Sequence, residues 1–184
     1  MQFIDLKAQQ ARIKDKIDAR IATVLVHGAY ILGPEVTELE SKLSEFCGVK
    51  HTITCANGTD ALLLALRALD VGAGDEVVTT PFTFFATAGA VHNVGARPVF
   101  VDIDPQTLGM DLDQVIDSIT PRTKGIFLTH ILGYDALSDA FLAEIGRRGI
   151  PLIEDVCESH GATHGGRRLG SFGLMSNFSF YYAH

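Results

Sequence analysis

The sequence predicts an α/β fold of three layers, in which a mostly parallel sheet is covered by helices on both faces. Two observations support this prediction. Short apolar runs typical of buried strands alternate along the chain with segments that have helical spacing or helix-ending residues. Polar or glycine-containing stretches directly follow several of these runs, at the strand ends where parallel sheets bind ligands. The 184 residues suffice for one domain with a core of its own.

The helices are predicted from apolar spacing and from residues that favour helix ends. Near the N-terminus, apolar residues recur at every third or fourth position, as on one face of an amphipathic helix. These residues are Ile13, Ile17, Ile21 and Val24. A second helix is expected over 33–48, because Pro34 suits the first helical position and Gly48 suits the exit. A third is expected over 57–69, with Asn57 as its cap.

The remaining elements follow in strict alternation. Three further helices are expected over 83–95, 111–119 and 137–149. The expected strands are 51–56, the second part of 72–81, 96–104, 124–130, 150–156 and an apolar strand at 178–183. This order predicts one domain over residues 1–184, and the last strand is where we expect the domain to be incomplete.

Composition excludes several classes of function. The net charge is −7 and no run of Lys or Arg occurs, so nucleic acid and anionic membranes are not expected partners. No segment is long and apolar enough to span a membrane, and the N-terminus is too charged for a signal peptide. Three widely spaced cysteines form neither a disulfide framework nor a zinc ribbon, which indicates reduced thiols in a cytoplasmic protein.

The stretch ANGTDA joins a predicted strand end to a predicted helix start. Free N–H groups and the positive end of the helix dipole bind phosphate at such a position. Gly58 would let the backbone approach a phosphate closely, and Thr59 would add a hydroxyl. The alternative is an ordinary capped helix. The stretch matches neither a Walker loop nor a G-x-G-x-x-G motif.

Three other stretches carry side chains that could bind a cofactor or a metal ion. IEDVCES places two acids where a buried strand ends, and a carboxylate there can bind a cationic ring nitrogen. The alternative is an aspartate that caps a helix or forms a salt bridge. PFTFFATA offers Phe84 and Phe85, and one of these rings could stack on a flat cofactor, but this stretch alone favours a place in the core for both. His160 and His164 have the i, i+4 spacing of metal ligands, but the glycine between them disfavours a helix, so no metal site is predicted.

Taken together, the motifs resemble the DegT/DnrJ/EryC1/StrS family of pyridoxal-phosphate (PLP) enzymes. The resemblance is carried, in this order, by ILGPEV, ANGTDAL, GDEVVTTPFTFFATA, PVFVDID, THILG, IEDVCESHGA, GSFG and FSFYYAH. It implies the large domain of fold type I, an aminotransferase acting on nucleotide-linked keto sugars, an amino donor such as glutamate, and a homodimer. Family members are considerably longer, so the resemblance also implies that 1–184 is the N-terminal half, without the small C-terminal domain and inactive by itself.

The resemblance also assigns roles to single residues. Gly58 and Thr59 match the phosphate cradle, and the hydroxyl of Ser179 matches a further phosphate ligand. Phe84 matches the aromatic residue that stacks on the cofactor ring, and Asp155 matches the acid that pairs with the ring nitrogen.

Two residues match the family less completely. Glu158 falls where the family often carries a glutamine beside the cofactor. His130 matches the histidine of an HLYG stretch, of which THILG lacks the tyrosine.

The end of FSFYYAH raises an alternative reaction. Aligned without a gap, His184 falls on the lysine that most of the family uses to bind the cofactor covalently. One branch of the family, the sugar 3-dehydratases, carries histidine there and uses pyridoxamine phosphate (PMP), with the histidine moving a proton. The aminotransferase is the first interpretation and the 3-dehydratase, with His184 and Asp155 as catalytic residues, is the second.

Two interpretations from other classes remain. A degenerate cofactor-binding protein without catalysis would not need an acid at the ring nitrogen, which Asp155 supplies. A plain nucleotide-binding α/β domain would require a glycine-rich phosphate loop after the first strand, and none is present.

Overall fold

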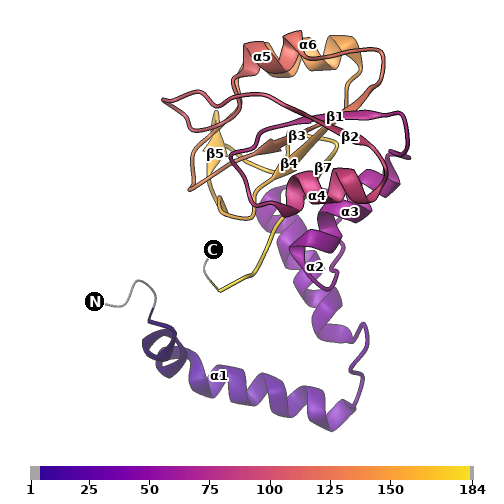
Figure 1. Ribbon diagram of the computed structural model, residues 1–184. Coiled ribbons are helices and arrows are strands. Elements are labelled where there is room, and N and C mark those ends of the chain that lie inside the picture. Colours follow the sequence, from indigo (N-terminus) through magenta and orange to yellow (C-terminus); the bar gives the residue numbers. More distant parts are fainter. Residues whose placement is uncertain (1–4, 183–184) are drawn as a thin grey trace. The chain divides into compact units, whose positions relative to one another are not determined.

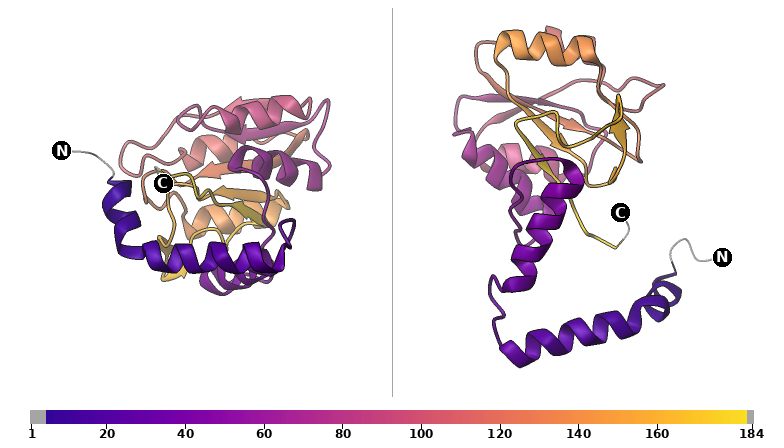
Figure 2. Two further views of the ribbon diagram at one scale, coloured as in Figure 1. Left: turned by 90° about the horizontal axis from the view of Figure 1, so that it is seen from below. Right: turned by 180° about the vertical axis from the view of Figure 1, so that it is seen from behind.

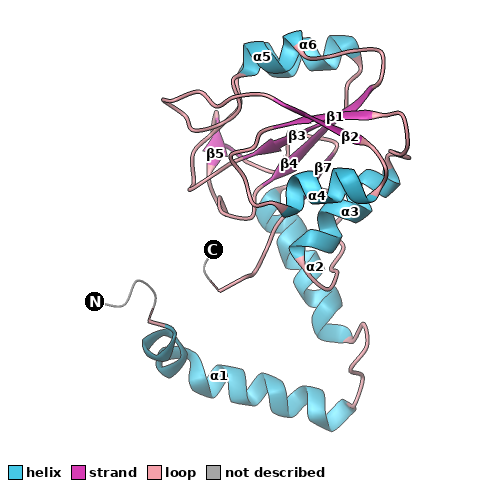
Figure 3. Cartoon of the chain, in the orientation of Figure 1, coloured by secondary structure: helices cyan, strands magenta, loops and turns pink. Residues whose placement is uncertain are grey.

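The computed structural model describes residues 5–182, which divide into two compact units (Figures 1 and 3). The first unit comprises the described residues up to Phe46 together with Lys50–Thr54, and the second comprises mainly Cys55–Tyr182. Among the described residues, no helix is long and apolar enough to cross a membrane.

The first unit contains the two predicted N-terminal helices. Helix α1 (Leu6–His27) begins where Asp5 accepts the N–H of Ala8, and it ends at Gly28, whose positive φ of 68° a glycine adopts at no steric cost. Helix α2 (Pro34–Cys47) begins at the predicted proline. The Arg20 guanidinium of α1 donates to both carboxylate oxygens of Glu38 in α2, at 2.9 and 3.0 Å, and so joins the two helices.

The strand predicted over 51–56 does not form. The segment is extended, but its polar groups bond to α2 instead of a neighbouring strand. Glu40 accepts both the N–H of Thr54, at 2.8 Å, and its hydroxyl, at 2.9 Å. Because Ile53 remains 84% exposed, no sheet covers the segment, and its β-branched composition alone was misleading.

In the described part of the second unit, five strands form one parallel sheet in the order β2-β1-β3-β4-β7. The strands are β1 (Glu76–Thr79), β2 (Arg97–Phe100), β3 (Thr123–Thr129), β4 (Leu152–Asp155) and β7 (Met175–Asn177). Helices α3 (Gly58–Ala68) and α4 (Ala86–Asn93) cover one face, and α5 (Leu112–Asp117) and α6 (Asp139–Arg148) cover the other (Figures 1 and 2). This is the predicted three-layer architecture.

The two faces of the sheet are built from alternating residues of the same strands. Val77 and Phe127 pack in the core beneath α3 and α4, whereas their neighbours Val78 and Leu128 pack in the core beneath α5 and α6. Strands buried on both faces read as continuous apolar runs, which is why the sequence shows them clearly.

The strand order reverses between β1 and β3. From β1 the chain passes through α4 to β2 on one side, and from β2 it passes through α5 to β3 on the other side of β1. The two connections use opposite faces of the sheet, as right-handed crossovers in opposite directions require. Ligands bind beyond the carboxyl ends of the strands near such a reversal.

The C-terminal region differs from the prediction. The last strand, β7, precedes the expected 178–183, and the described residues 178–182 lie outside the sheet. The reason is that β4, the strand beside it, ends at Asp155, which is paired with Asn177, so no partner is left for a longer strand. Ahead of β7, strands β5 (Thr163–His164) and β6 (Arg167–Arg168) form an unpredicted hairpin. The glycine pair between them, with φ of 56° and 83°, suits a two-residue hairpin turn.

A buried carboxylate secures the amino ends of the strands. Glu76 of β1 is almost fully buried and accepts from the Thr120 hydroxyl at 2.6 Å, from Arg97 at 2.5 Å and from Arg122 at 2.6 and 2.8 Å. The hydrogen bond from Thr120, followed by those from the two arginines, lowers the pKa of Glu76 to about 2.

We therefore predict that Glu76→Gln destabilises the protein at neutral pH and that the difference from wild type shrinks as pH falls from 4.5 toward 2. A carboxylate whose pKa is lowered by folding stabilises the fold above its unfolded pKa, near 4.5, and loses this contribution as pH falls through the folded value. Urea unfolding of the intact protein at several pH values measures this. Glu45→Gln, on the exposed surface of α2, is the control, and a pH-independent difference would contradict the prediction.

Candidate functional site

Within residues 5–182, the predicted site residues lie at the carboxyl edge of the sheet in the second unit. They follow β1, β4 and β7 or begin α3, although they come from distant parts of the sequence. The position is the one that the reversal of strand order favours for a ligand.

The start of α3 offers unpaired backbone donors. Asn57 caps the helix by accepting the N–H of Asp60 at 2.9 Å, and its own amide donates to the Asp60 carboxylate at 2.9 Å. Among the described residues, nothing accepts the N–H groups of Gly58 and Thr59. Two free donors at the positive end of an eleven-residue helix suit an anion such as a phosphate group.

Ser179 lies beside this helix start. A methyl group added at Gly58 would lie 3.5 Å from the Cβ of Ser179, 3.7 Å from its Oγ and 3.8 Å from the Sγ of Cys157. The hydroxyl of Ser179 therefore lies close to Gly58 at the start of α3. The Ser179 Oγ also accepts the N–H of Tyr181 at 3.2 Å, so its own hydrogen is available to a ligand.

Asp155 ends β4 and is only 6% exposed. Its Oδ1 accepts from the side-chain amide of Asn177 at 3.0 Å and from the N–H of Cys157 at 3.2 Å. The Cys157 side chain also hydrogen-bonds to this carboxylate, and no N–H group of the described residues donates to its Oδ2. A buried carboxylate with one oxygen held and the other available can accept a hydrogen bond from a protonated ring nitrogen.

Phe84 and Phe85 follow β1 and are exposed, by 64% and 77% respectively. The alternative that both rings belong to the core is therefore wrong. Their centroids lie 4.4 Å apart at an interplanar angle of 53°, and Phe84 keeps most of its ring surface available for stacking.

Glu158 is exposed, and its carboxylate accepts the N–H of Leu132 at 3.3 Å. Leu132 has a positive φ of 53°, which is uncommon for leucine, so the bond holds an unfavourable turn after β3. The next residue, Ser159, accepts the N–H of Gly133 at 3.0 Å and donates to the carbonyl of His130 at 2.6 Å. In this structure Glu158 thus contacts the turn after β3.

Glu154, the acid that directly precedes Asp155 in IEDVCES, is buried on the opposite face of the sheet. Glu154 accepts the N–H groups of Gly170, Phe172 and Gly173 at 2.6–2.8 Å and bonds to His130 Nε2 at 3.1 Å. Burial alone would raise the pKa of Glu154, but the hydrogen bonds from His130, Gly173 and Gly170 outweigh it and lower that pKa.

This network also defines the role of His130. Since His130 Nδ1 accepts the N–H of Ala136 at 3.3 Å, its Nε2 carries the hydrogen that goes to Glu154. The network was not predicted from the sequence, although strand alternation in β4 requires that Glu154 and Asp155 face opposite sides.

Asn177 and Cys157 are two further residues that the sequence analysis missed. The Asn177 amide donates to the Sγ of Cys157 at 3.1 Å as well as to Asp155. Burial, together with the charge of Asp155, strongly raises the pKa of the Cys157 thiol. Cys157 therefore remains a neutral thiol and is no nucleophile at neutral pH.

The two histidines of SHGATH have separate partners. His164 bonds to Asp135 at 2.6 Å and to Asp139 at 3.1 Å, and the bond to Asp135 in particular raises the pKa of His164. His160 lies between the rings of Phe178 and Phe180, at 5.4 and 5.3 Å. His184, the predicted catalytic histidine, lies outside the described residues.

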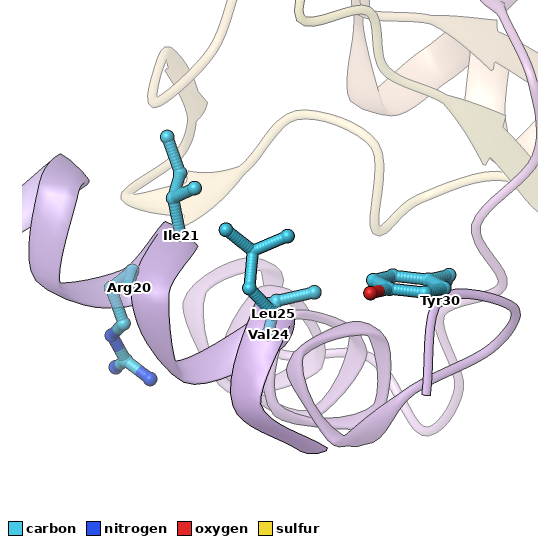
Figure 4. A pocket seen from close by; sticks show the side chains of 5 residues that line it. All are labelled: Arg20, Ile21, Val24, Leu25 and Tyr30. Atoms are coloured by element: carbon cyan, nitrogen blue, oxygen red, sulfur yellow. The ribbon is translucent and has the colours of Figure 1, made fainter. Parts of the chain in front are cut away.

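Two cavities of the described chain lie away from these residues. One, of about 300 Å³, is on α1 and the loop after it (Figure 4). It is lined by Arg20, Ile21, Val24, Leu25 and Tyr30. The other, of about 340 Å³, lies near the start of α5, with Asp104 and Asp111 among its lining residues.

Comparisons with known proteins agree with this fold. The chain is 53% identical over 181 residues to the UDP-2-acetamido-2-deoxy-3-oxo-D-glucuronate aminotransferase of Pseudomonas aeruginosa, covering 98% of this chain and 50% of the relative. The structure is similar to that of a DegT DnrJ EryC1 StrS aminotransferase from Brucella abortus, with a TM-score of 0.95 and 44% identity over 100% of this chain and 51% of the other. The chain therefore spans about half the length of the proteins it matches.

A dehydratase is also similar. The GDP-4-keto-6-deoxy-D-mannose-3-dehydratase of E. coli, solved with bound hydrated PLP, has a TM-score of 0.83 and 34% identity over 89% of this chain and 45% of its own. The model of the DegT/DnrJ/EryC1/StrS aminotransferase family matches residues 11–184. With that match over nearly the whole sequence and the fold of its solved members, the chain belongs to the DegT/DnrJ/EryC1/StrS aminotransferase family.

Proposed function

We propose that the intact protein is a PLP-dependent aminotransferase that acts on a nucleotide-linked keto sugar. The observation that carries the proposal is the meeting of a helix start with free N–H groups, the hydroxyl of Ser179 and the buried carboxylate of Asp155 at one edge of the sheet. The 53% identity to an enzyme named as a UDP-sugar aminotransferase supports the substrate class.

The residues present fit the cofactor. The N–H groups of Gly58 and Thr59 and the hydroxyl of Ser179 would hold its phosphate, and the exposed ring of Phe84 would stack on its pyridine ring. When bound, the cofactor supplies an electron sink for a carbanion at the substrate carbon. Asp155 would keep a proton on the ring nitrogen, because its buried carboxylate accepts a charge-assisted hydrogen bond at Oδ2.

The further parts of the proposal come from the family. Residues 1–184 would supply a cofactor-binding large domain, glutamate would serve as amino donor, and two copies would form a homodimer. Glu158 would lie beside the cofactor while its carboxylate holds the turn after β3.

The second candidate function is a PMP-dependent nucleotide-sugar 3-dehydratase. The observation that favours it is His184, which aligns without a gap with the family's cofactor-binding lysine. An imidazole has no primary amine, but it moves protons near neutral pH. The similarity to a GDP-sugar 3-dehydratase structure supports this candidate.

We predict that Asp155→Asn in the intact protein abolishes turnover and weakens cofactor binding by roughly 10- to 100-fold, as loss of a charge-assisted hydrogen bond would. The phosphate contacts should keep residual binding, measured by absorbance titration with PLP and PMP. Asp117→Asn, at the exposed end of α5, is the matched control. Turnover of Asp155→Asn at the wild-type rate would remove Asp155 from its proposed role.

Borohydride reduction followed by peptide mass spectrometry separates the two reactions. We predict that the wild-type peptide containing His184 carries no cofactor adduct and that His184→Lys creates one, because only a primary amine forms a reducible link with PLP. An adduct on another lysine of the wild-type protein identifies the aminotransferase. No adduct on any peptide, with PMP-dependent release of water from the sugar, identifies the dehydratase.

A further inference from the structure

We propose that Asn177 is a positioning residue that holds the Asp155 carboxylate so that its Oδ2 meets the cofactor ring nitrogen. This role rests on the proposed function and applies to both candidate reactions. Asn177 directly precedes the FSF stretch and is not among the site residues predicted from the sequence.

The sheet itself pairs the two residues. Asp155 and Asn177 are the last residues of the neighbouring parallel strands β4 and β7 and are partners in register. Both are nearly inaccessible, at 6% and 4% exposed. A hydrogen bond of 3.0 Å joins the Asn177 amide nitrogen to Oδ1 of Asp155 in these surroundings, where water competes little.

Asn177 and the backbone act on the same oxygen. Oδ1 of Asp155 accepts from the Asn177 amide and from the N–H of Cys157, whereas no N–H group of the described residues donates to Oδ2. Two donors on one oxygen fix the rotation of the carboxylate. They also favour its charged form, which the pairing with a protonated ring nitrogen requires.

The orientation of the Asn177 amide carries a free-energy cost. Its Nδ2 donates to Asp155 and to Cys157, but its carbonyl oxygen is buried without a partner among the described residues. Leaving a buried acceptor unpaired is unfavourable. An apolar side chain would avoid this cost, so the structure favours a function for the amide donor. Rotation of the amide by 180° would set an oxygen against the charged carboxylate, which is worse.

The test uses the intact protein loaded with PMP labelled with ¹⁵N at the ring nitrogen. In Asn177→Leu we expect the ring ¹⁵N resonance to move toward that of an unprotonated pyridine. The reason is that a carboxylate with one donor fewer is a stronger base and takes a larger share of the proton. Affinity for PMP should fall roughly two- to tenfold, the range of one hydrogen bond.

A merely structural role would give a different pattern. Leucine fits a buried site and removes the unpaired carbonyl, so thermal unfolding of the variant should stay close to wild type while the ¹⁵N signal moves. Asn93→Leu, at the exposed end of α4, is the matched control and should leave the signal unchanged.

A second variant keeps the proposal testable if Asn177→Leu does not fold. Asn177→Asp preserves the shape but sets two carboxylates against each other, and such a pair retains one proton well above the usual pKa range. The ring ¹⁵N signal of this variant should gain a titration step near neutral pH that the wild type lacks.

The outcomes distinguish the two levels of the proposal. If the wild type binds neither PLP nor PMP, the proposed function fails and the role of Asn177 fails with it. If the wild type binds PMP but the ¹⁵N signals of both Asn177 variants superimpose on it at every pH, only the role of Asn177 is overturned.

Discussion

The burial of Glu154 is the constraint on which the second unit depends. A carboxylate in the middle of a parallel sheet must be fully hydrogen-bonded, and Glu154 meets this requirement with three backbone N–H groups from 170–173 and with His130. These bonds fix the segment that leads into β7. Since β7 carries Asn177 and is followed by Ser179, the position of both residues depends on a carboxylate that faces the other side of the sheet.

Adjacent residues of β4 thus serve opposite purposes. Glu154 accepts hydrogen bonds on both carboxylate oxygens and so fixes the segment 170–173. No N–H group of the described residues donates to Oδ2 of Asp155. The difference arises from strand geometry, because neighbouring side chains point to opposite faces of a sheet. Of these two adjacent acids, Glu154 therefore has a structural role, and Asp155 is the one proposed to meet the cofactor. A polar network that is complete on one face lets the other face keep an incomplete one for a ligand.

The sequence predicted the layers, the six described helices and four of the five strands of the described sheet, because these elements carry local signals. Asn57 and Pro34 mark helix starts by their own side chains, and buried parallel strands are continuous apolar runs. The wrong predictions concern segments whose structure depends on a hydrogen-bonding partner elsewhere in the chain. The segment 51–56 has strand-like composition but bonds to Glu40, and 178–182 is apolar but follows the point where β4 ends.

Some residues of the candidate site could likewise be predicted from the sequence, and others could not. Gly58 and Asp155 could be proposed from strand and helix ends, since topology brings all such ends to one edge. The pairing of Asp155 with Asn177, and the network of Glu154 with 170–173, join residues 16 to 22 positions apart whose types carry no shared signal. Only the register of β4 against β7 places them together.

The two candidate reactions make the same demand on this edge of the sheet. Both need a phosphate cradle at α3 and an ionised acid at the ring nitrogen, because both draw electrons into the same ring. They diverge at residue 184, where a primary amine permits a covalent link and an imidazole permits only proton transfer. In the proposed function, cofactor binding would thus depend on the sheet and its helix starts, whereas the choice of reaction would depend on residue 184. The hydrogen bonds from Asn177 and Cys157 to Asp155 would then serve either reaction unchanged.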